Sequence, residues 1–352
     1  MSEKQNPYTL VFGREPSELI TRTAQAQSVI DVFSSNPPSQ QVYMITGVRG
    51  SGKTVFMTSI ADYFKKQENW VTVELNPSRD MLTALAAKLG SQSSLARMFQ
   101  SASINLSLFG IGLEVKGSVP VSDIETALEK MLESIKKHGK KVLVTVDEVT
   151  ASQYMKEFCS SFQIFVRNDL PVYMLMTGLF ENIEMLRNTP NLTFLYRATR
   201  VPMNPLNQLT IADNYQRIFQ LDRKSSIEMA SWTKGYSFAF QVLGYFTWEH
   251  AGNYQDAWEE FYSYLSEYSY IKIWSGLSIN DRKVTIAVAK SESGRSKDIR
   301  QFLGWTTDQF NPYRMRLIRK VLLDGETYGQ VRFTLPVFGR FILEYSELLG
   351  AE

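Results

Sequence analysis

The feature that most constrains the fold is a glycine-rich string between a short apolar run and a stretch with apolar residues at helical spacing. Residues 47–54 read Gly-Val-Arg-Gly-Ser-Gly-Lys-Thr and match the pattern G-x-x-x-x-G-K-[ST] at every fixed position. Residues 42–46 are mostly β-formers, and Val55, Phe56 and Ile60 follow the string. A strand, a glycine loop and a helix in this order hold phosphate oxygens on backbone N–H groups. The sequence therefore predicts a phosphate loop for a nucleoside triphosphate within an α/β fold.

Each residue type in the string has a physical role in holding a triphosphate. Glycines let the backbone curl around the β-phosphate, and the following helix offers its positive N-terminal end. We expect the Lys53 ammonium to reach the β- and γ-phosphate oxygens and the Thr54 hydroxyl to bind Mg²⁺. The residues predicted to line the nucleotide are Gly47, Val48, Arg49, Gly50, Ser51, Gly52, Lys53, Thr54 and Val55.

An acidic pair follows a second β-rich apolar run. Asp147 and Glu148 come directly after residues 142–146, downstream of the phosphate loop. Such a pair can simply end a strand, but after a phosphate loop Asp147 is expected to hold Mg²⁺ through water and Glu148 to orient the attacking water. Metabolite kinases and G-proteins of this fold generally lack the glutamate, and the guanine-reading sequence N-K-x-D is absent. ATP hydrolysis is therefore favoured over GTP hydrolysis or metabolite phosphorylation.

Three further polar residues follow the acidic pair along the chain. Thr177 ends the apolar run 172–176, where its hydroxyl could touch the γ-phosphate or the attacking water; a plain helix cap or turn residue is the alternative. Arg197 and Arg200 precede a proline-rich break. Either could complete a neighbouring subunit's site as an arginine finger, or lie solvated at a domain edge.

The chain divides into three parts by its patterning. Unbroken apolar runs that alternate with helical patterns predict a parallel sheet buried on both faces, a P-loop core over residues 1–205. Alternating apolar residues at about 103–116 predict an inserted β-hairpin. Residues 206–275 predict an α-helical lid, and residues 276–352 a winged helix-turn-helix domain.

The basic charge of the chain gathers in its C-terminal part. Residues 282–332 carry eleven Lys and Arg against five Asp and Glu, whereas the whole chain has a net charge of +2. Asn311 and Pro312 are typical of a helix start, and the helix that they predict places Arg316, Arg319 and Lys320 on one arc. Residues 325–335 could form a wing that carries Arg332. This face suits double-stranded DNA, with a protein-binding surface as the alternative.

Composition limits where such a chain works. Cys159 is the single cysteine, so no internal disulfide framework is expected. The residues after Met1 show no apolar signal segment or Arg-rich transit pattern, and no apolar stretch approaches about 20 residues. We expect a soluble, cytoplasmic protein without a membrane partner.

Taken together, the motifs resemble the AAA+ ATPases, in the prokaryotic branch similar to origin-recognition and initiator ATPases and neighbouring the STAND ATPases. The resemblance rests on residues 12–19 (Phe-Gly-Arg-Glu-Pro-Ser-Glu-Leu), the phosphate loop, Val-Asp-Glu-Val at 146–149, Tyr-Arg-Ala-Thr-Arg at 196–200 and Thr-Lys-Gly-Tyr at 233–236. It implies an AAA+-like core with a helical lid and a C-terminal winged helix.

The resemblance also implies roles for single residues. Phe12 and Arg14 would border the adenine, Thr177 would act as sensor 1, and Arg197 is the best finger candidate. Residues 235–241 carry no sensor-2 arginine, which initiators usually have, and look more like the lid turn of the signalling relatives.

The expected activity is Mg²⁺-dependent ATP hydrolysis with slow turnover, ATP binding between core and lid, and a nucleotide-dependent switch. Its expected partners are ATP or ADP and double-stranded DNA at the winged helix. The alternative is a STAND-like regulatory ATPase whose winged helix contacts a protein partner or a second copy of the chain.

Overall fold

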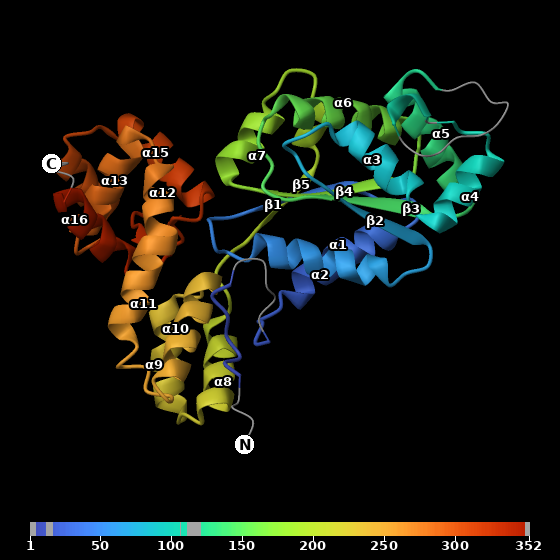
Figure 1. Ribbon diagram of the computed structural model, residues 1–352. Helices are drawn as coiled ribbons and strands as arrows, with labels where there is room; N and C mark the ends of the chain where they lie inside the picture. Colours follow the sequence, from blue (N-terminus) through green and yellow to red (C-terminus); the bar gives the residue numbers. More distant parts are fainter. Residues whose placement is uncertain (1–4, 12–16, 106, 111–120, 349–352) are drawn as a thin grey trace. The chain divides into compact units, whose positions relative to one another are not determined.

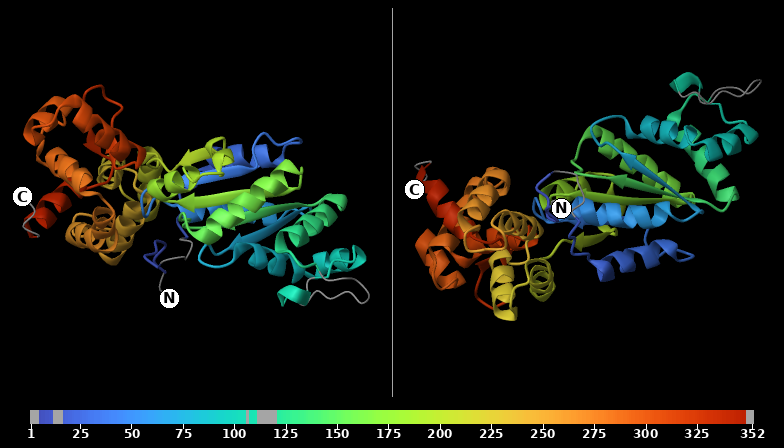
Figure 2. Two further views of the ribbon diagram at one scale, coloured as in Figure 1. Left: turned by 90° about the horizontal axis from the view of Figure 1, so that it is seen from above. Right: turned by 60° about the horizontal axis from the view of Figure 1, so that its bottom comes forward.

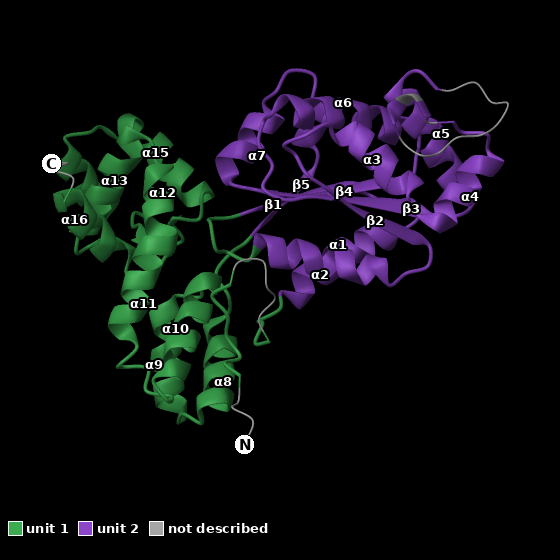
Figure 3. Cartoon of the chain, viewed as in Figure 1, with its two compact units in different colours: residues 1–21, 47–52, 203–352 green, residues 22–46, 53–202 purple. Residues whose placement is uncertain are grey.

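The computed structural model describes residues 5–11, 17–105, 107–110 and 121–348 (Figure 1). The chain forms two compact units (Figure 3). Unit 1 comprises residues 1–21, 47–52 and 203–352, and unit 2 comprises residues 22–46 and 53–202.

Unit 2 is built on a five-stranded sheet in which every pairing is parallel. The strand order is β2-β3-β4-β1-β5. The strands are β1 (Val42–Thr46), β2 (Trp70–Leu75), β3 (Lys141–Val146), β4 (Val172–Gly178) and β5 (Thr199–Pro202). All residues of β1 and β4 are buried, so side chains on both faces of the sheet are covered. The predicted α/β core with a parallel sheet is confirmed.

Helices cover the two faces of this sheet. Helices α1 (Thr23–Ser34) and α2 (Lys53–Lys65) lie on one face, and α3 (Met81–Gly90), α6 (Gln153–Arg167) and α7 (Phe180–Arg187) on the other (Figures 1 and 2). Helices α4 (Ser93–Ser101) and α5 (Ile124–Lys137) pack beside α3. Aromatic rings pack α1 and α2 against the sheet. Phe33 of α1 contacts Phe64 of α2, and Phe64 contacts Trp70 of β2.

The strand register brings three chain segments to one edge of the sheet. Parallel strands end at the same edge, and Val146 of β3 is paired with Met176 of β4. The next residues along these two strands are Asp147 and Thr177, while Ile45 of β1 is the partner of Thr177 on its other side. Thr177 therefore lies between the strand that leads to the phosphate loop and the strand that ends in the acidic pair.

The predicted hairpin at about 103–116 is not a strand in its described part. Residues Ser107–Phe109 form a 3-10 turn instead. The side chain of Asn105 accepts a hydrogen bond from the Ser107 N–H, at 3.1 Å between Oδ1 and N, and this local bond turns the backbone away from an extended path. Residues 111–116 lie outside the described residues, so the pairing itself stays a prediction.

Unit 1 is mainly helical. Its first part holds α8 (Gln208–Phe219), α9 (Arg223–Thr233), α10 (Ser237–Glu249) and α11 (Trp258–Leu265), which continues through a π-helix (Ser266–Tyr270) into α12 (Ile271–Ser275). Its second part holds α13 (Ile279–Lys290), α14 (Ser296–Leu303), α15 (Thr307–Arg319), the antiparallel pair β6 (Leu323–Asp324) and β7 (Arg332–Phe333), and α16 (Phe338–Leu348). One hydrophobic cluster runs through both parts, from Tyr8 to Ile342. The division into a lid and a separate C-terminal domain therefore stays a prediction.

Helix α15 starts earlier than the Asn311-Pro312 pair predicted. It begins at Thr307, and Pro312 lies inside it. A capping box decides the start: the Thr306 side chain accepts from the Gln309 N–H, and the Gln309 side chain accepts from the Thr306 N–H. Two backbone donors are satisfied at once, which outweighs the single hydrogen bond that Pro312 cannot make. Among the described residues, none of the helices is both long and apolar enough to cross a membrane.

Candidate functional site

In unit 2, three side chains meet at the carboxyl ends of β3 and β4. The Thr54 hydroxyl, in the first turn of α2, donates to Asp147 with 2.9 Å between Oγ1 and Oδ2. The Thr177 hydroxyl donates to the other carboxylate oxygen, Oδ1. Thr177 is fully buried at the end of β4, so its hydroxyl fixes the orientation of the Asp147 carboxylate. The structure thus brings together Thr54, Asp147 and Thr177, which the sequence had placed 30 to 123 positions apart.

Glu148 follows in an unusual backbone conformation. Its φ of 50° lies in the left-handed region, which costs a non-glycine residue on the order of 1 kcal/mol. Its N–H donates to Asp147 Oδ1 and to Thr177 Oγ1, both at 3.0 Å, and the Val149 N–H donates to the Thr177 carbonyl at 2.8 Å. These bonds hold the exposed Glu148 next to Asp147 at the strand end.

The donor set fits a hard divalent cation. Magnesium prefers oxygen ligands, and the Thr54 hydroxyl and the Asp147 carboxylate are oxygen donors on the partly exposed side of this cluster. Both would hold Mg²⁺ only if the Thr54 hydroxyl released its hydrogen bond to Asp147. Among the described residues no group of three His, Cys, Asp or Glu side chains could hold a metal, so any cation here needs ligand oxygens from elsewhere, such as those of a phosphate.

In unit 1, the phosphate loop has the backbone that its glycines predict. Gly50 has a φ of +75° and Gly52 a φ of +87°. A Cβ on Gly50 would lie 2.4 Å from the hydroxyl of Tyr236 and 2.8 Å from Cβ of Phe238, so only glycine fits there. Glycine is needed at this position both for its conformation and for the close approach of the turn between α9 and α10.

The outer carbonyls of the loop are bound by that turn. Tyr236 Oη donates to the Arg49 carbonyl at 2.6 Å, the Phe238 N–H to the Gly50 carbonyl at 3.0 Å, and Ser237 Oγ to the Ser51 carbonyl at 3.2 Å. The C=O and the following N–H of a trans peptide point in opposite directions. The N–H groups of Gly50 and Gly52 therefore face away from the turn, as donors for an anion would.

A buried hydroxyl in the loop lacks a partner among the described residues. The Ser51 side chain is only 4% exposed, and its Oγ makes no hydrogen bond to any described residue. A buried hydroxyl without a partner costs about 1–3 kcal/mol, which a ligand oxygen would recover. The loop and its surroundings thus fit a phosphate group.

The predicted adenine neighbours Phe12 and Arg14 lie outside the described residues. The segments on either side of them are bound to α8 and α10. The Thr9 N–H donates to Gln241 Oε1 at 3.2 Å, and Gln241 Nε2 donates to the Glu18 carbonyl at 2.7 Å. One glutamine of α10 thus ties both flanks of the segment, and the adenine contact itself stays a prediction.

The two finger candidates differ in their surroundings. Arg200 is paired with Glu184, at 2.9 Å between Nη1 and Oε1, and its guanidinium lies 5.8 Å from the Phe180 ring centroid. Arg197 is exposed at the end of the 3-10 turn Thr193–Tyr196. The buried Arg187 holds that turn by donating to the Leu195 and Tyr196 carbonyls.

The predicted DNA-facing arc is not one exposed face. Lys320 is 6% exposed and its ammonium lies 3.5 Å from Oδ2 of Asp281, which is itself 1% exposed. Arg316 donates to Asp281 Oδ1 through Nε at 3.0 Å and Nη2 at 2.7 Å. The arc is wrong for Lys320, because Asp281 of α13 draws this cation into the interior. Arg319 and Arg332 are exposed, as predicted.

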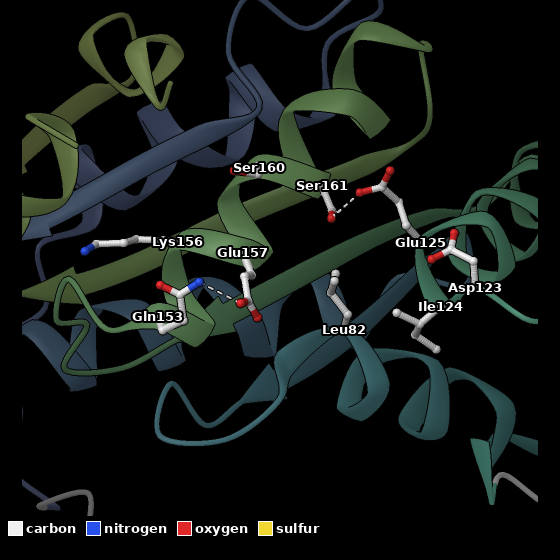
Figure 4. Close-up of a pocket in the computed structure, with 9 residues that line it drawn as sticks. All are labelled: Leu82, Asp123, Ile124, Glu125, Gln153, Lys156, Glu157, Ser160 and Ser161. Carbon is white, nitrogen blue, oxygen red and sulfur yellow. Dashed lines mark hydrogen bonds between the residues drawn. The ribbon is translucent and has the colours of Figure 1, made fainter. Parts of the chain in front are cut away.

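A separate hollow on unit 2 lies among α3, α5 and α6 (Figure 4). Its polar side chains contact one another, since Ser161 donates to Glu125 and Gln153 donates to Glu157. With Asp123 it carries three carboxylates against the single cation Lys156. The charge is wrong for phosphate, so this hollow is not a candidate for a nucleotide.

Comparison with known proteins agrees with this geometry. Residues 27–184 match a family model described as an ATPase domain predominantly from Archaea. Residues 268–342 match a second model, described as a domain of unknown function. A search of curated proteins found no match.

Two solved structures share the fold across almost the whole chain. A Walker-type ATPase of Pyrococcus abyssi is similar with a TM-score of 0.64 at 13% identity, over 93% of this chain and 97% of that one. The ORC2 protein of Aeropyrum pernix in its ADP form is similar with a TM-score of 0.50 at 14% identity, over 97% of both chains. The predicted P-loop ATPase fold is confirmed.

Proposed function

We propose that this chain binds ATP with Mg²⁺, hydrolyses it slowly, and serves as a nucleotide-dependent switch. The observation that carries the proposal is the cluster at the ends of β3 and β4. There a buried Thr177 orients Asp147, Asp147 meets Thr54 of the loop-following helix, and Glu148 stands beside them. The archaeal-type ATPase domain over residues 27–184 supports the same activity.

Each residue of the cluster has a task in this reaction. Bound Mg²⁺ supplies positive charge that stabilises the phosphate oxygens as negative charge shifts during transfer. Thr54 and Asp147 would hold the ion, and Lys53 adds a second positive charge at the phosphates. Glu148 accepts a hydrogen bond, and then the proton, from the attacking water. Arg197 is the better finger candidate because Arg200 is already paired with Glu184.

Two substitutions separate binding from hydrolysis. Glu148→Gln should keep ATP affinity and lose turnover, whereas Lys53→Ala should weaken ATP binding itself. Glu68→Gln changes an exposed glutamate in the turn that follows α2 and should match the parent. ATP affinity by equilibrium titration and phosphate release by a coupled assay give the two readings. Hydrolysis by Glu148→Gln at the parent's rate would remove Glu148 from this role.

We further propose double-stranded DNA as a partner of the C-terminal part. Helices α13, α14 and α15 followed by the β6–β7 pair have the order of a winged helix, and the Arg295–Gln330 bridge joins the start of α14 to the β6–β7 connection. Exposed cations near this bridge and on α15 are Arg295, Lys297, Arg319 and Arg332. They are the available phosphate contacts, since Arg316 and Lys320 are bound to Asp281.

Salt dependence tests the DNA proposal. Lys297→Glu and Arg332→Glu should each weaken duplex binding. Each should also make the negative slope of log affinity against log salt less steep by about 1. Lys130→Glu, an exposed lysine on α5 of unit 2, is the matched charge reversal and should bind like the parent. Absence of duplex binding at low salt with ATP, with ADP and without nucleotide would contradict this proposal. It would favour the alternative hypothesis that the C-terminal part binds a protein.

A further inference from the structure

The turn between α9 and α10, residues 233–238, contacts the phosphate loop on one side. As described above, Tyr236, Ser237 and the Phe238 N–H bind three consecutive loop carbonyls at 2.6 to 3.2 Å. Tyr236 is 4% exposed, and burial raises the pKa of its hydroxyl, so the group remains a donor over the physiological pH range. The loop backbone from Arg49 to Ser51 is therefore bound continuously to this turn.

The same turn contacts the C-terminal part of unit 1 on its other side. Lys234 Nζ donates to the Phe333 carbonyl of β7 at 3.2 Å. The Tyr236 hydroxyl also lies 2.7 Å from Ser269 Oγ in the π-helix, and the next residue of that helix, Tyr270, donates to the Pro336 carbonyl at 2.5 Å. Two short paths thus run from the phosphate loop to the segment around residues 332–336.

The turn itself is held in one conformation. Gly235 has a φ of +75°, and a Cβ there would lie 2.4 Å from the Leu206 carbonyl oxygen. The Leu206 N–H donates to the Gly235 carbonyl at 2.7 Å, and the Gly235 N–H donates to Thr233 Oγ1 at 3.1 Å. A turn fixed at this many points transmits a displacement of the loop instead of absorbing it locally.

We infer that Tyr236 is a positioning residue for the phosphate loop and that the turn at residues 233–238 couples this loop to β7 and the neighbouring C-terminal segment. The inference rests on the proposed nucleotide function of the loop. Binding of phosphate to the loop N–H groups reorients the peptide planes, and each plane carries its carbonyl with it. The partners of those carbonyls, Tyr236 first, move in response, and Lys234 and Ser269 pass the change to the C-terminal part.

Two variants test the two sides of the turn separately, the contact with the phosphate loop and the contact with β7. Tyr236→Phe keeps the ring and removes the hydroxyl with its bonds to the Arg49 carbonyl and to Ser269. We expect nucleotide affinity to fall about tenfold, from the loss of the one buried hydrogen bond to the loop. Lys234→Met keeps the loop contact and removes the bond to Phe333, so nucleotide affinity should stay within about twofold. Tyr215→Phe is the matched control, since Tyr215 donates to the Phe240 carbonyl in the same unit without contact to the loop.

The readout is amide hydrogen exchange over residues 323–335, with and without ADP or a non-hydrolysable ATP analogue. The parent and Tyr215→Phe should show a nucleotide-dependent change there at saturating nucleotide. Tyr236→Phe should lose it, and Lys234→Met, which leaves the path through Ser269 and Tyr270 intact, should reduce it. Circular dichroism and thermal melting check that each variant is folded. If the parent binds nucleotide but shows no change at 323–335, or if both variants respond like the parent, the coupling is wrong. If the parent binds no nucleotide, the proposed function fails together with it.

Discussion

The Thr54 hydroxyl donates a hydrogen bond to Asp147 Oδ2 across 2.9 Å and so joins the first turn of α2 to the end of β3. Thr177 occupies the other carboxylate oxygen of the same aspartate. Both oxygens of Asp147 are therefore satisfied within the protein, and a bound cation must replace the hydrogen of Thr54 while the bond to Thr177 persists.

From this arrangement we predict that Thr54→Ala lowers the apparent affinity for Mg²⁺ in the presence of ATP by at least about tenfold, because a ligand oxygen is lost. Thr54→Ser keeps the hydroxyl and should stay close to the parent. Titration of ATP hydrolysis with Mg²⁺ measures the effect, and equal Mg²⁺ dependence in the alanine variant and the parent would contradict it.

Thr177→Val should lower turnover by about 10- to 100-fold with little change in ATP affinity. The substitution keeps the size of the side chain but removes the donor to Asp147 and the acceptor for the Glu148 N–H. A 10- to 100-fold loss of activity is usual when a metal ligand loses its hydrogen-bond partner. Steady-state kinetics separate kcat from KM. Thr177→Ser should restore most of the rate, and a serine variant as slow as the valine variant would point to packing instead.

Asp281→Asn should destabilise the protein strongly, by about 3–5 kcal/mol. The change leaves Lys320 buried without an opposing charge and removes the ion pair to Arg316. Urea unfolding measures the free energy. Arg319→Gln on the exposed side of α15 is the control and should alter stability by less than about 0.5 kcal/mol.

The buried cysteine predicts a dependence of stability on alkaline pH. Burial raises the pKa of the Cys159 thiol to about 12, whereas an unfolded thiol ionises near about 8.5. The contribution of the neutral, buried thiol to the free energy of unfolding is complete below about pH 8.5. It is lost as pH rises toward 12, by about 1.4 kcal/mol per pH unit.

Cys159→Val should therefore flatten the fall in unfolding free energy between pH 8 and pH 10. Urea unfolding at both pH values gives the slopes. A thiol reagent offers a second reading, because it should label the parent at pH 8 only after denaturant is added. Rapid labelling of the folded parent would show that the thiol is not buried.

The proximity of Asp147 and Thr177 follows from the sequence because both positions are set by local order along parallel strands. Once Asp147 and Thr177 end two strands of one parallel sheet, the geometry of the sheet places them side by side. The backbone conformation of the loop could also be predicted from the sequence, because the positive φ at Gly50 and Gly52 is part of the motif itself.

Other features depended on partners far away in the sequence. Helical periodicity predicts the direction in which the Lys320 side chain leaves the helix axis. Whether that direction leads to water or to the interior is decided by Asp281, 39 positions earlier in the sequence. Likewise no pattern relates Tyr236 to Arg49, 187 positions apart, although the missing lid arginine did mark residues 235–241 as different. Helix α15 begins at Thr307 and not at Pro312, because the capping box of Thr306 and Gln309 sets its start.

The turn at residues 233–238 has a thermodynamic consequence in the opposite direction. If nucleotide at the phosphate loop changes the affinity of the C-terminal part for a partner, then that partner must change nucleotide affinity by the same factor. Whatever binds near β7 is then also an effector of the loop, and its presence would be measurable as tighter or weaker retention of ADP. A chain with no arginine between residues 235 and 241 would in this way couple its phosphate loop to the segment around β7 through side chains that donate to backbone carbonyls.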